Sequence, residues 1–132
     1  EREAYRIMKM SRNTALGLLA VLLVLLLFGT QMPGAWRDEA FRAVRLPWQM
    51  NKVAHFVLFT SIACLARVPP LRWSLARVVF TALVLALLTE SLQHFASHRE
   101  PSWFDVGVDL AGAALGVMLA WGLTSTRRIF VS

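Results

Sequence analysis

The chain has 132 residues, of which 57% are hydrophobic, and its formal net charge is +6. Its mean hydropathy of +0.54 excludes an ordinary soluble domain of this size and indicates an integral membrane protein. The positive charge does not indicate nucleic-acid binding, because the basic residues lie in loops and at the ends of apolar segments. A single cysteine, Cys64, excludes an internal disulfide and a thiolate metal centre.

The first apolar segment runs from about Thr14 to Met32, and it is uncharged throughout its central part from Leu18 to Phe28. A run of this length predicts a helix that spans the bilayer. The residues at the start of the chain, Glu1 to Ile7, differ in composition from this segment. We expect them to be a cloning remnant or the result of a misassigned start, with Met8 or Met10 as the natural first residue.

Three further helices come after a loop that extends from Gly29 to Asn51. The second helix is predicted from about Asn51 to Arg67 and ends before Pro69-Pro70, because proline cannot continue a helix. It is shorter and less apolar than the first helix. The third helix is predicted from about Leu71 to Phe95, and the fourth from about Ser102 to Leu123.

These segments predict an all-α fold, an integral membrane four-helix bundle formed by residues 14–123, with an N-terminal segment 1–13 and a tail 124–132. Lysine and arginine are retained on the cytoplasmic side of a membrane. With four spans, five basic residues lie on one side, and nine lie on the side of the termini: Arg2, Arg6, Lys9, Arg12, Arg67, Arg72, Arg77, Arg127 and Arg128. We therefore expect both termini to be cytoplasmic. The side of the termini still has more basic residues than the other side if residues 1–7 are left out of the count.

A polar run from Thr89 to Asp105 separates the third and fourth apolar segments. Charged groups are costly to keep near a bilayer, so this run is the natural candidate for a functional site. The topology brings the start of the second helix to the same outer face. The residues expected to gather there are His55, Glu90, Gln93, Arg99, Asp105 and Asp109.

Helical spacing groups these residues further. Glu90, Gln93 and His94 share one face of the third helix. A stripe along the fourth helix consists of Asp105, Asp109, Gly112 and Gly116. The two glycines are assigned to helix packing, because their lack of a side chain lets a neighbouring helix approach closely and hold Asp109 against a partner. Away from bulk water Asp109 needs pairing or protonation, and Arg99 or His55 is the available cation.

Several short motifs occur in a fixed order between residues 51 and 122. They are Lys52-x-x-His55-Phe56-x-x-Phe59, Glu90-x-x-Gln93-x-Phe95, Arg99, Ser102-x-x-Asp105 and Gly112-x-x-x-Gly116. Together, their order and spacing resemble those of the VanZ-like membrane proteins. Two positions depart from the family pattern, which often has Asp in place of Asn51 and has Asn in place of Asp109. The second departure affects the charge of the site, because Asp109 can carry a negative charge and an asparagine cannot.

The resemblance implies a small multi-pass protein of the bacterial cytoplasmic (inner) membrane that acts in the cell envelope. The named member of this family is associated with resistance to the glycopeptide antibiotic teicoplanin. The resemblance supplies a fold and a location, but it does not supply a chemical mechanism.

Two functions fit this arrangement, and whether the protein is an enzyme is left open. The first is binding or processing of a membrane lipid or a lipid-linked, phosphate-bearing envelope molecule. Its catalytic groups would be Glu90, Asp105 and His55, and its ligand-binding groups Lys52, Gln93, Arg99 and Asp109. The alternative is a non-catalytic protein that sequesters a lipophilic ligand or partners another envelope protein. Ion transport is disfavoured, because the inner halves of the last two helices are apolar.

Some of these residues also have structural interpretations. Ser102-x-x-Asp105 is a pattern typical of a helix start, in which a side chain caps free backbone amides. His55 can be a polar residue at the membrane boundary. No cofactor is predicted, and the one alternative for a metal is a set of residues at helical spacing, Glu90, His94 and His98.

Overall fold

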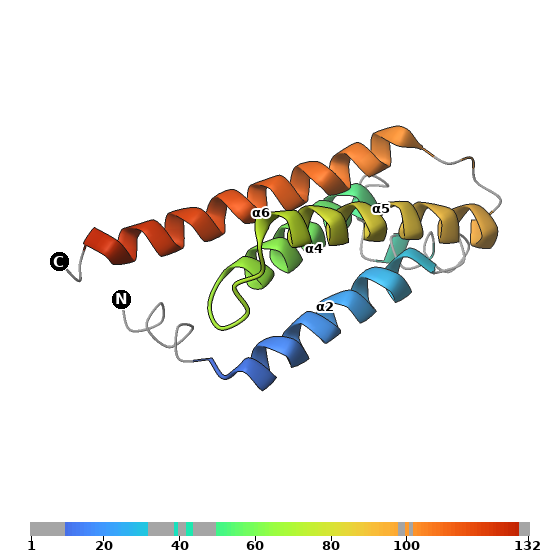
Figure 1. The fold of residues 1–132 in the computed structure, drawn as a ribbon. Helices are drawn as coiled ribbons and strands as arrows, with labels where there is room; N and C mark the ends of the chain where they lie inside the picture. Colours follow the sequence, from blue (N-terminus) through green and yellow to red (C-terminus); the bar gives the residue numbers. More distant parts are fainter. Residues whose placement is uncertain are drawn as a thin grey trace.

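The computed structural model describes residues 10–31, 39, 42–43, 50–97, 100 and 102–129. These residues form long helices and, within the described ranges, no strand, which confirms the predicted all-α fold. The four long helices are α2 (Arg12–Gln31), α4 (Met50–Arg67), α5 (Leu75–Ser97) and α6 (Trp103–Ile129) (Figure 1).

Two helix boundaries differ from the predicted ones. α5 begins at Leu75 rather than near Leu71, because residues 68–74 form a turn that closes on the end of α4. In this turn the backbone N–H of Trp73 donates to the carbonyl of Ala66 over 2.8 Å, and Arg72 adopts a left-handed backbone with φ of 48°. α6 continues to Ile129, beyond the apolar residues on which its predicted end was based.

Three of the described helices are long and apolar enough to cross a membrane, namely α2, α5 and α6. α4 does not meet this criterion, because its first turns carry polar residues such as Lys52 and His55. It is instead the central helix and contacts each of the other three. Large apolar side chains are exposed on the outside of the bundle, among them Phe28, Phe80 and Met118, as expected for a surface that faces lipid.

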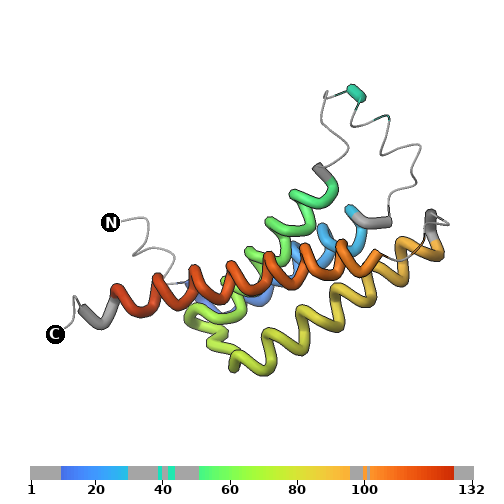
Figure 2. The backbone as a smooth tube through the Cα atoms, turned by 90° about the horizontal axis from the view of Figure 1, so that it is seen from above, coloured from blue at the N-terminus to red at the C-terminus, as the bar shows by residue number. Residues whose placement is uncertain are grey.

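The helices lie in layers, with α6 on one side of α4 and α5 and with α2 on the other side (Figures 1 and 2). Neighbouring helices in the chain run in opposite directions. The end of α5 and the starts of α4 and α6 therefore meet at one end of the bundle, which we call the site end. The α4–α5 turn, residues 67–75, lies at the opposite end, which we call the turn end.

The contact between α4 and α6 is close enough to bring two backbones together. A Cβ atom added to Gly112 would lie 2.6 Å from the carbonyl oxygen of Phe56, and one added to Gly116 would collide with the carbonyl oxygen of Thr60. The Thr60 hydroxyl lies 2.8 Å from the Phe56 carbonyl oxygen and 2.9 Å from that of Gly112, so it can donate to either helix. The Gly112-x-x-x-Gly116 stripe thus packs inside the chain, against α4.

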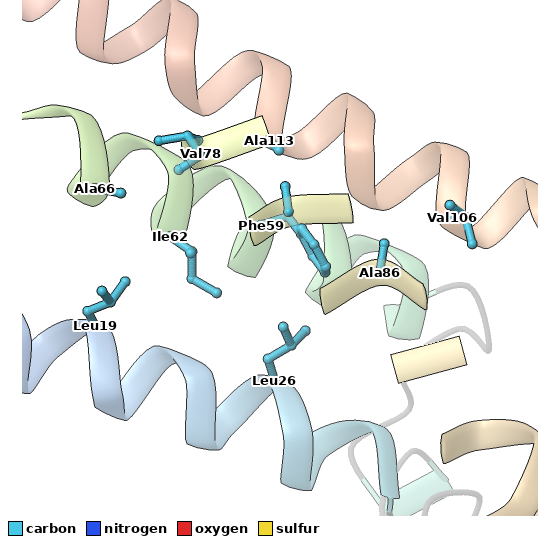
Figure 3. Packing of buried hydrophobic residues seen from close by; sticks show 11 residues of the cluster. Leu19, Leu26, Phe59, Ile62, Ala66, Val78, Ala86, Val106 and Ala113 are labelled. Atoms are coloured by element: carbon cyan, nitrogen blue, oxygen red, sulfur yellow. The ribbon is translucent and has the colours of Figure 1, made fainter. Parts of the chain in front are cut away.

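The apolar core is formed by residues from all four helices, α2, α4, α5 and α6. Leu19 and Leu26 of α2 point toward Phe59 and Ile62 of α4 (Figure 3). Most of the remaining buried core residues are alanines, which keep the helices close together. They include Ala63, Ala66, Ala82, Ala86 and Ala113.

Replacing Gly116 by alanine should destabilise the protein, because the added methyl group would lie 2.9 Å from Cβ of Ala63 and collide with the Thr60 carbonyl. We expect a loss of about 1–3 kcal/mol, the usual cost of overpacking, measured by thermal unfolding in detergent. Gly122→Ala is the matched control on the same helix, since nothing lies within 4 Å of its added methyl group. Equal stability of the two variants would contradict the proposed role of Gly116.

Candidate functional site

Three helices contribute polar side chains to one cleft at the site end of the bundle. The cleft is lined by Asn51, Lys52, His55, Gln93, Asp105, Val108 and Asp109. Lys52 and His55 are three residues apart on α4, and Asp105 and Asp109 are four residues apart on α6, so each pair shares a helix face. The cleft brings together five of the residues proposed from the sequence.

The centre of this cluster is a buried pair formed by His55 and Asp109. Nδ1 of His55 lies 3.0 Å from Oδ1 of Asp109, and the two residues are only 7% and 2% exposed. When the Asp109 carboxylate is ionised it can only accept, and Nδ1 then donates this hydrogen bond. His55 and Arg99 are the two cationic partners expected for Asp109 from the sequence. His55 lies beside Asp109, whereas Arg99 lies outside the described residues.

Gln93 completes a line of three side chains. Its side-chain nitrogen lies 3.4 Å from Nε2 of His55, which is a long hydrogen bond. When Nδ1 carries the proton of a neutral imidazole, Nε2 has the lone pair and accepts from the Gln93 amide. With Asp109 ionised, the two neighbours therefore favour one orientation and one tautomer of the ring.

A second pair, Lys52 and Asp105, lies nearer the surface. Nζ of Lys52 is 3.2 Å from Oδ1 of Asp105, and the side chains are 34% and 21% exposed. The ammonium also lies 4.6 Å from the centre of the Phe104 ring, a favourable cation–π contact. The buried Oδ1 of Asp105 therefore has the Lys52 ammonium as its ion-pair partner. Because a carboxylate oxygen has more than one lone pair, it can also accept a hydrogen bond from a ligand or a water molecule.

Glu90 has a different position from the one expected of a catalytic acid or base. It is not among the residues that line the cleft. Its Oε1 accepts a hydrogen bond from the backbone N–H of Ser102, immediately before α6. A carboxylate at a helix start satisfies free amides and interacts favourably with the helix dipole. Glu90 therefore joins the end of α5 to the start of α6 and supplies the cap that the sequence pattern had suggested for Asp105.

The remaining sequence proposals concern the α5–α6 connection. In the metal alternative, Glu90 and His94 lie on α5, whereas His98 lies outside the described residues. Within the part of the chain that is described, no three His, Cys, Asp or Glu side chains are grouped so that they could hold a metal ion. Sequence reasoning overlooked Asn51 and Val108 as cleft residues. Their proximity to Lys52 and Asp109 in the chain was the available signal.

An apolar outer surface around a buried polar cluster defines a helical membrane protein with a polar site at one end of its bundle. More specifically, the chain belongs to the VanZ/LLP1 family, which it matches over residues 5–126. The match covers α2, α4 and α5 completely and nearly all of α6, so it confirms the resemblance seen in the sequence. No curated protein and no solved structure gives a significant match.

The two pairs in the cleft should contribute unequally to stability. Leucine substitutions of His55 and Asp109, made singly and together, form a double-mutant cycle. Each single substitution leaves a buried polar group without its partner, so it should lower the free energy of unfolding by about 3–5 kcal/mol. The same cycle on Lys52 and Asp105 is the matched control, with an expected coupling of about 1 kcal/mol or less, because that pair is partly exposed. Thermal unfolding in detergent measures both. Equal coupling energies would refute the greater importance of the buried pair.

Substitutions of Glu90 test whether its hydrogen bond to Ser102 stabilises the protein. Glu90→Gln keeps an oxygen that can accept from Ser102, so it should retain most of the stability that Glu90→Ala loses, about 0.5–2 kcal/mol for a lost cap. Stability is again read from thermal unfolding. If Glu90→Gln is as unstable as Glu90→Ala, the hydrogen bond to Ser102 is not the stabilising contact.

Proposed function

We propose that the protein binds, in the cleft at its site end, the polar headgroup of a lipid-linked envelope molecule in the bacterial cytoplasmic membrane. The observation that carries this proposal is the buried His55–Asp109 pair directly behind an open cleft. Packing alone does not require such a pair, because apolar side chains of similar volume often stabilise a protein equally well. Ionisable residues within a membrane bundle commonly mark a binding site or reaction pathway.

The cleft limits the part of a ligand that the protein can hold. It is an open surface cleft rather than a large enclosed pocket, so its polar side chains can contact part of a headgroup but cannot enclose a whole glycopeptide. The remainder of the ligand would lie outside the cleft, with its lipid chain along the apolar surface of the bundle.

The polar groups of the cleft favour a headgroup that both accepts and donates hydrogen bonds. Lys52, Asn51 and Gln93 supply donors, and the Asp105 carboxylate, which is paired with Lys52, supplies acceptor oxygens. The charge of Lys52 is offset by Asp105, so strong phosphate binding would require a further cation. Arg99, assigned from the sequence to ligand binding, is the residue we propose for that role.

A second candidate function, processing of the bound headgroup, is favoured by the orientation of His55. A carboxylate that accepts from Nδ1 leaves the lone pair of the imidazole on Nε2, which is the arrangement of a general base. For this role a water molecule must replace the Gln93 amide, whose contact with Nε2 is long at 3.4 Å. No hydroxyl or thiol side chain is among the described residues that line the cleft. A reaction would therefore use water, activated by His55, as its nucleophile, with Asp105 available as an acid or base.

The binding proposal predicts that specific lipids copurify with the protein and are lost with the cleft. We expect His55→Gln and Asp105→Asn to lower the amount of retained envelope lipid at least about tenfold, the effect of losing one strong hydrogen bond. Mass spectrometry of lipids extracted from the purified protein measures this. Ser61→Ala is the control, since Ser61 lies on α4 away from the cleft and its hydroxyl donates to the Val57 carbonyl.

The same variants connect the cleft with antibiotic resistance, to which the family resemblance points. Each is expressed at the wild-type level, and sensitivity to teicoplanin is compared. Lost protection together with lost lipid supports binding as the function, whereas lost protection with retained lipid supports processing. If all variants retain lipid and protection at the level of Ser61→Ala, the cleft is not the functional site.

A further inference from the structure

Two tryptophans lie at opposite ends of the apolar part of α6. Trp103 is the first residue of the helix and is 81% exposed, and Trp121 is 70% exposed. They are 18 residues apart, or five full helical turns, so they share one face of α6 and are separated by about 27 Å. The hydrocarbon layer of a bilayer is about 30 Å thick, and tryptophan is enriched at both of its boundaries. The two rings therefore have the spacing expected of residues at these boundaries.

Charged residues follow the same two boundaries. Between Trp103 and Trp121, α6 has only two of them, Asp105 and Asp109, and both line the cleft. Beyond Trp121 the sequence becomes polar and reaches Arg127-Arg128. The residues that α6 exposes between the two tryptophans have large apolar side chains or are glycine and alanine. This part of α6 therefore suits the hydrocarbon layer.

Two charged groups from the other helices lie near the boundary at the site end. The Glu90 carboxylate of α5 accepts a hydrogen bond from the N–H of Ser102, the residue before Trp103. The Lys52 ammonium of α4 lies 3.2 Å from Oδ1 of Asp105, two residues after Trp103. Long basic side chains near helix ends commonly extend toward the membrane surface in this way. The level of Trp103 is therefore also the level at which α4 and α5 place these charges.

The buried pair lies deeper than this level. Along the helix, Asp105 lies about 3 Å and Asp109 about 9 Å past Trp103. His55 shares the depth of Asp109, because its Nδ1 lies 3.0 Å from the Asp109 carboxylate. The Lys52–Asp105 pair therefore lies between the end of the bundle and the His55–Asp109 pair.

The cleft also has an edge on the outer surface of α6. Val108 lines the cleft and is half-buried. Helical spacing places Val108 on one stripe with three exposed residues, Phe104, Ala111 and Leu115. This apolar stripe leads from the cleft toward the middle of α6.

We propose that the cleft opens into the bilayer at the site end, and that its ligand is a membrane-anchored amphiphile that enters from the lipid. The apolar chain of the ligand lies along the stripe from Phe104 to Leu115, and the polar group next to that chain enters the cleft. A polar group is costly to bring about 9 Å into a hydrocarbon layer unless polar partners receive it, and His55 and Asp109 are such partners. This inference rests on the proposed function and specifies which part of the lipid the cleft contacts.

The depth of the cleft is tested with nitroxides on single cysteines at exposed positions of α6, in the full-length Cys64→Ser protein. In phosphatidylcholine vesicles, paramagnetic resonance compares the collisions of each nitroxide with oxygen, which concentrates in hydrocarbon, and with a water-soluble nickel chelate. The oxygen-to-nickel ratio should be at least about tenfold higher at Ala111→Cys than at Ser125→Cys, because polar solutes enter hydrocarbon poorly. Gly107→Cys, between the depths of the two carboxylates, should have an intermediate ratio. A ratio at Gly107→Cys equal to that at Ser125→Cys would place the cleft in water and overturn the proposal.

Entry from the lipid is tested at the edge of the cleft. A nitroxide at Val108→Cys should give an oxygen-to-nickel ratio close to that at Gly107→Cys, because the two positions have nearly the same depth. Thermal unfolding checks that the variant folds, and Phe104→Cys, on the same stripe, replaces it if it does not. A ratio at Val108→Cys as low as that at Ser125→Cys would show that the cleft opens to water, which would contradict the proposal.

These measurements need no ligand, so they separate this inference from the proposed function. If lipid is retained as the binding proposal predicts but the nickel chelate reaches Val108→Cys freely, the proposed function stands and entry from the bilayer is wrong. If Val108→Cys faces lipid but the cleft variants retain lipid at the wild-type level, the placement of the cleft stands and binding in it is wrong.

Discussion

The close approach of α4 and α6 is the constraint on which the site depends. Gly112 and Gly116 leave no room for a side chain against the carbonyls of α4, and the Thr60 hydroxyl bridges the two backbones. One turn toward the site end, the same two helices present His55 and Asp109 to each other at 3.0 Å. If the helices lay further apart, the imidazole and the carboxylate would each be buried without a partner, which is far more costly than the loss of one contact.

The two ends of the bundle have different chemistry. The site end combines two carboxylates, an imidazole, an ammonium and two amides in one small cleft, with opposite charges close together. Among the described residues, the turn between α4 and α5 has only positive charge, and the helix residues next to it belong to the apolar core. This division explains why α4 is the least apolar of the four helices: it carries polar groups at one end and an arginine at the other, while α2, α5 and α6 provide most of the apolar surface.

Much of this arrangement could be predicted from the sequence. Long uncharged runs indicated the helices, and alternating helix directions placed His55, Gln93 and Asp109 at the same end of the bundle. The role of Glu90 could not be inferred in this way, because it depends on a contact between its carboxylate and the backbone amide of Ser102, twelve residues further along the chain. The start of α5 was also missed, since the hydrogen bond from Trp73 to Ala66 closes the turn before the next helix begins. Both cases depend on backbone contacts that hydrophobic periodicity does not encode.

The pairing of His55 with Asp109 also has a consequence for biosynthesis. The two residues are 54 positions apart, so the ribosome completes α4 well before it makes the carboxylate that α4 requires. During that interval the helix with the weakest apolar character holds an imidazole without its buried partner, and it lacks the glycine surface against which it packs. A chain truncated before α6 would therefore lack both the carboxylate that pairs with His55 and the glycine surface against which α4 packs.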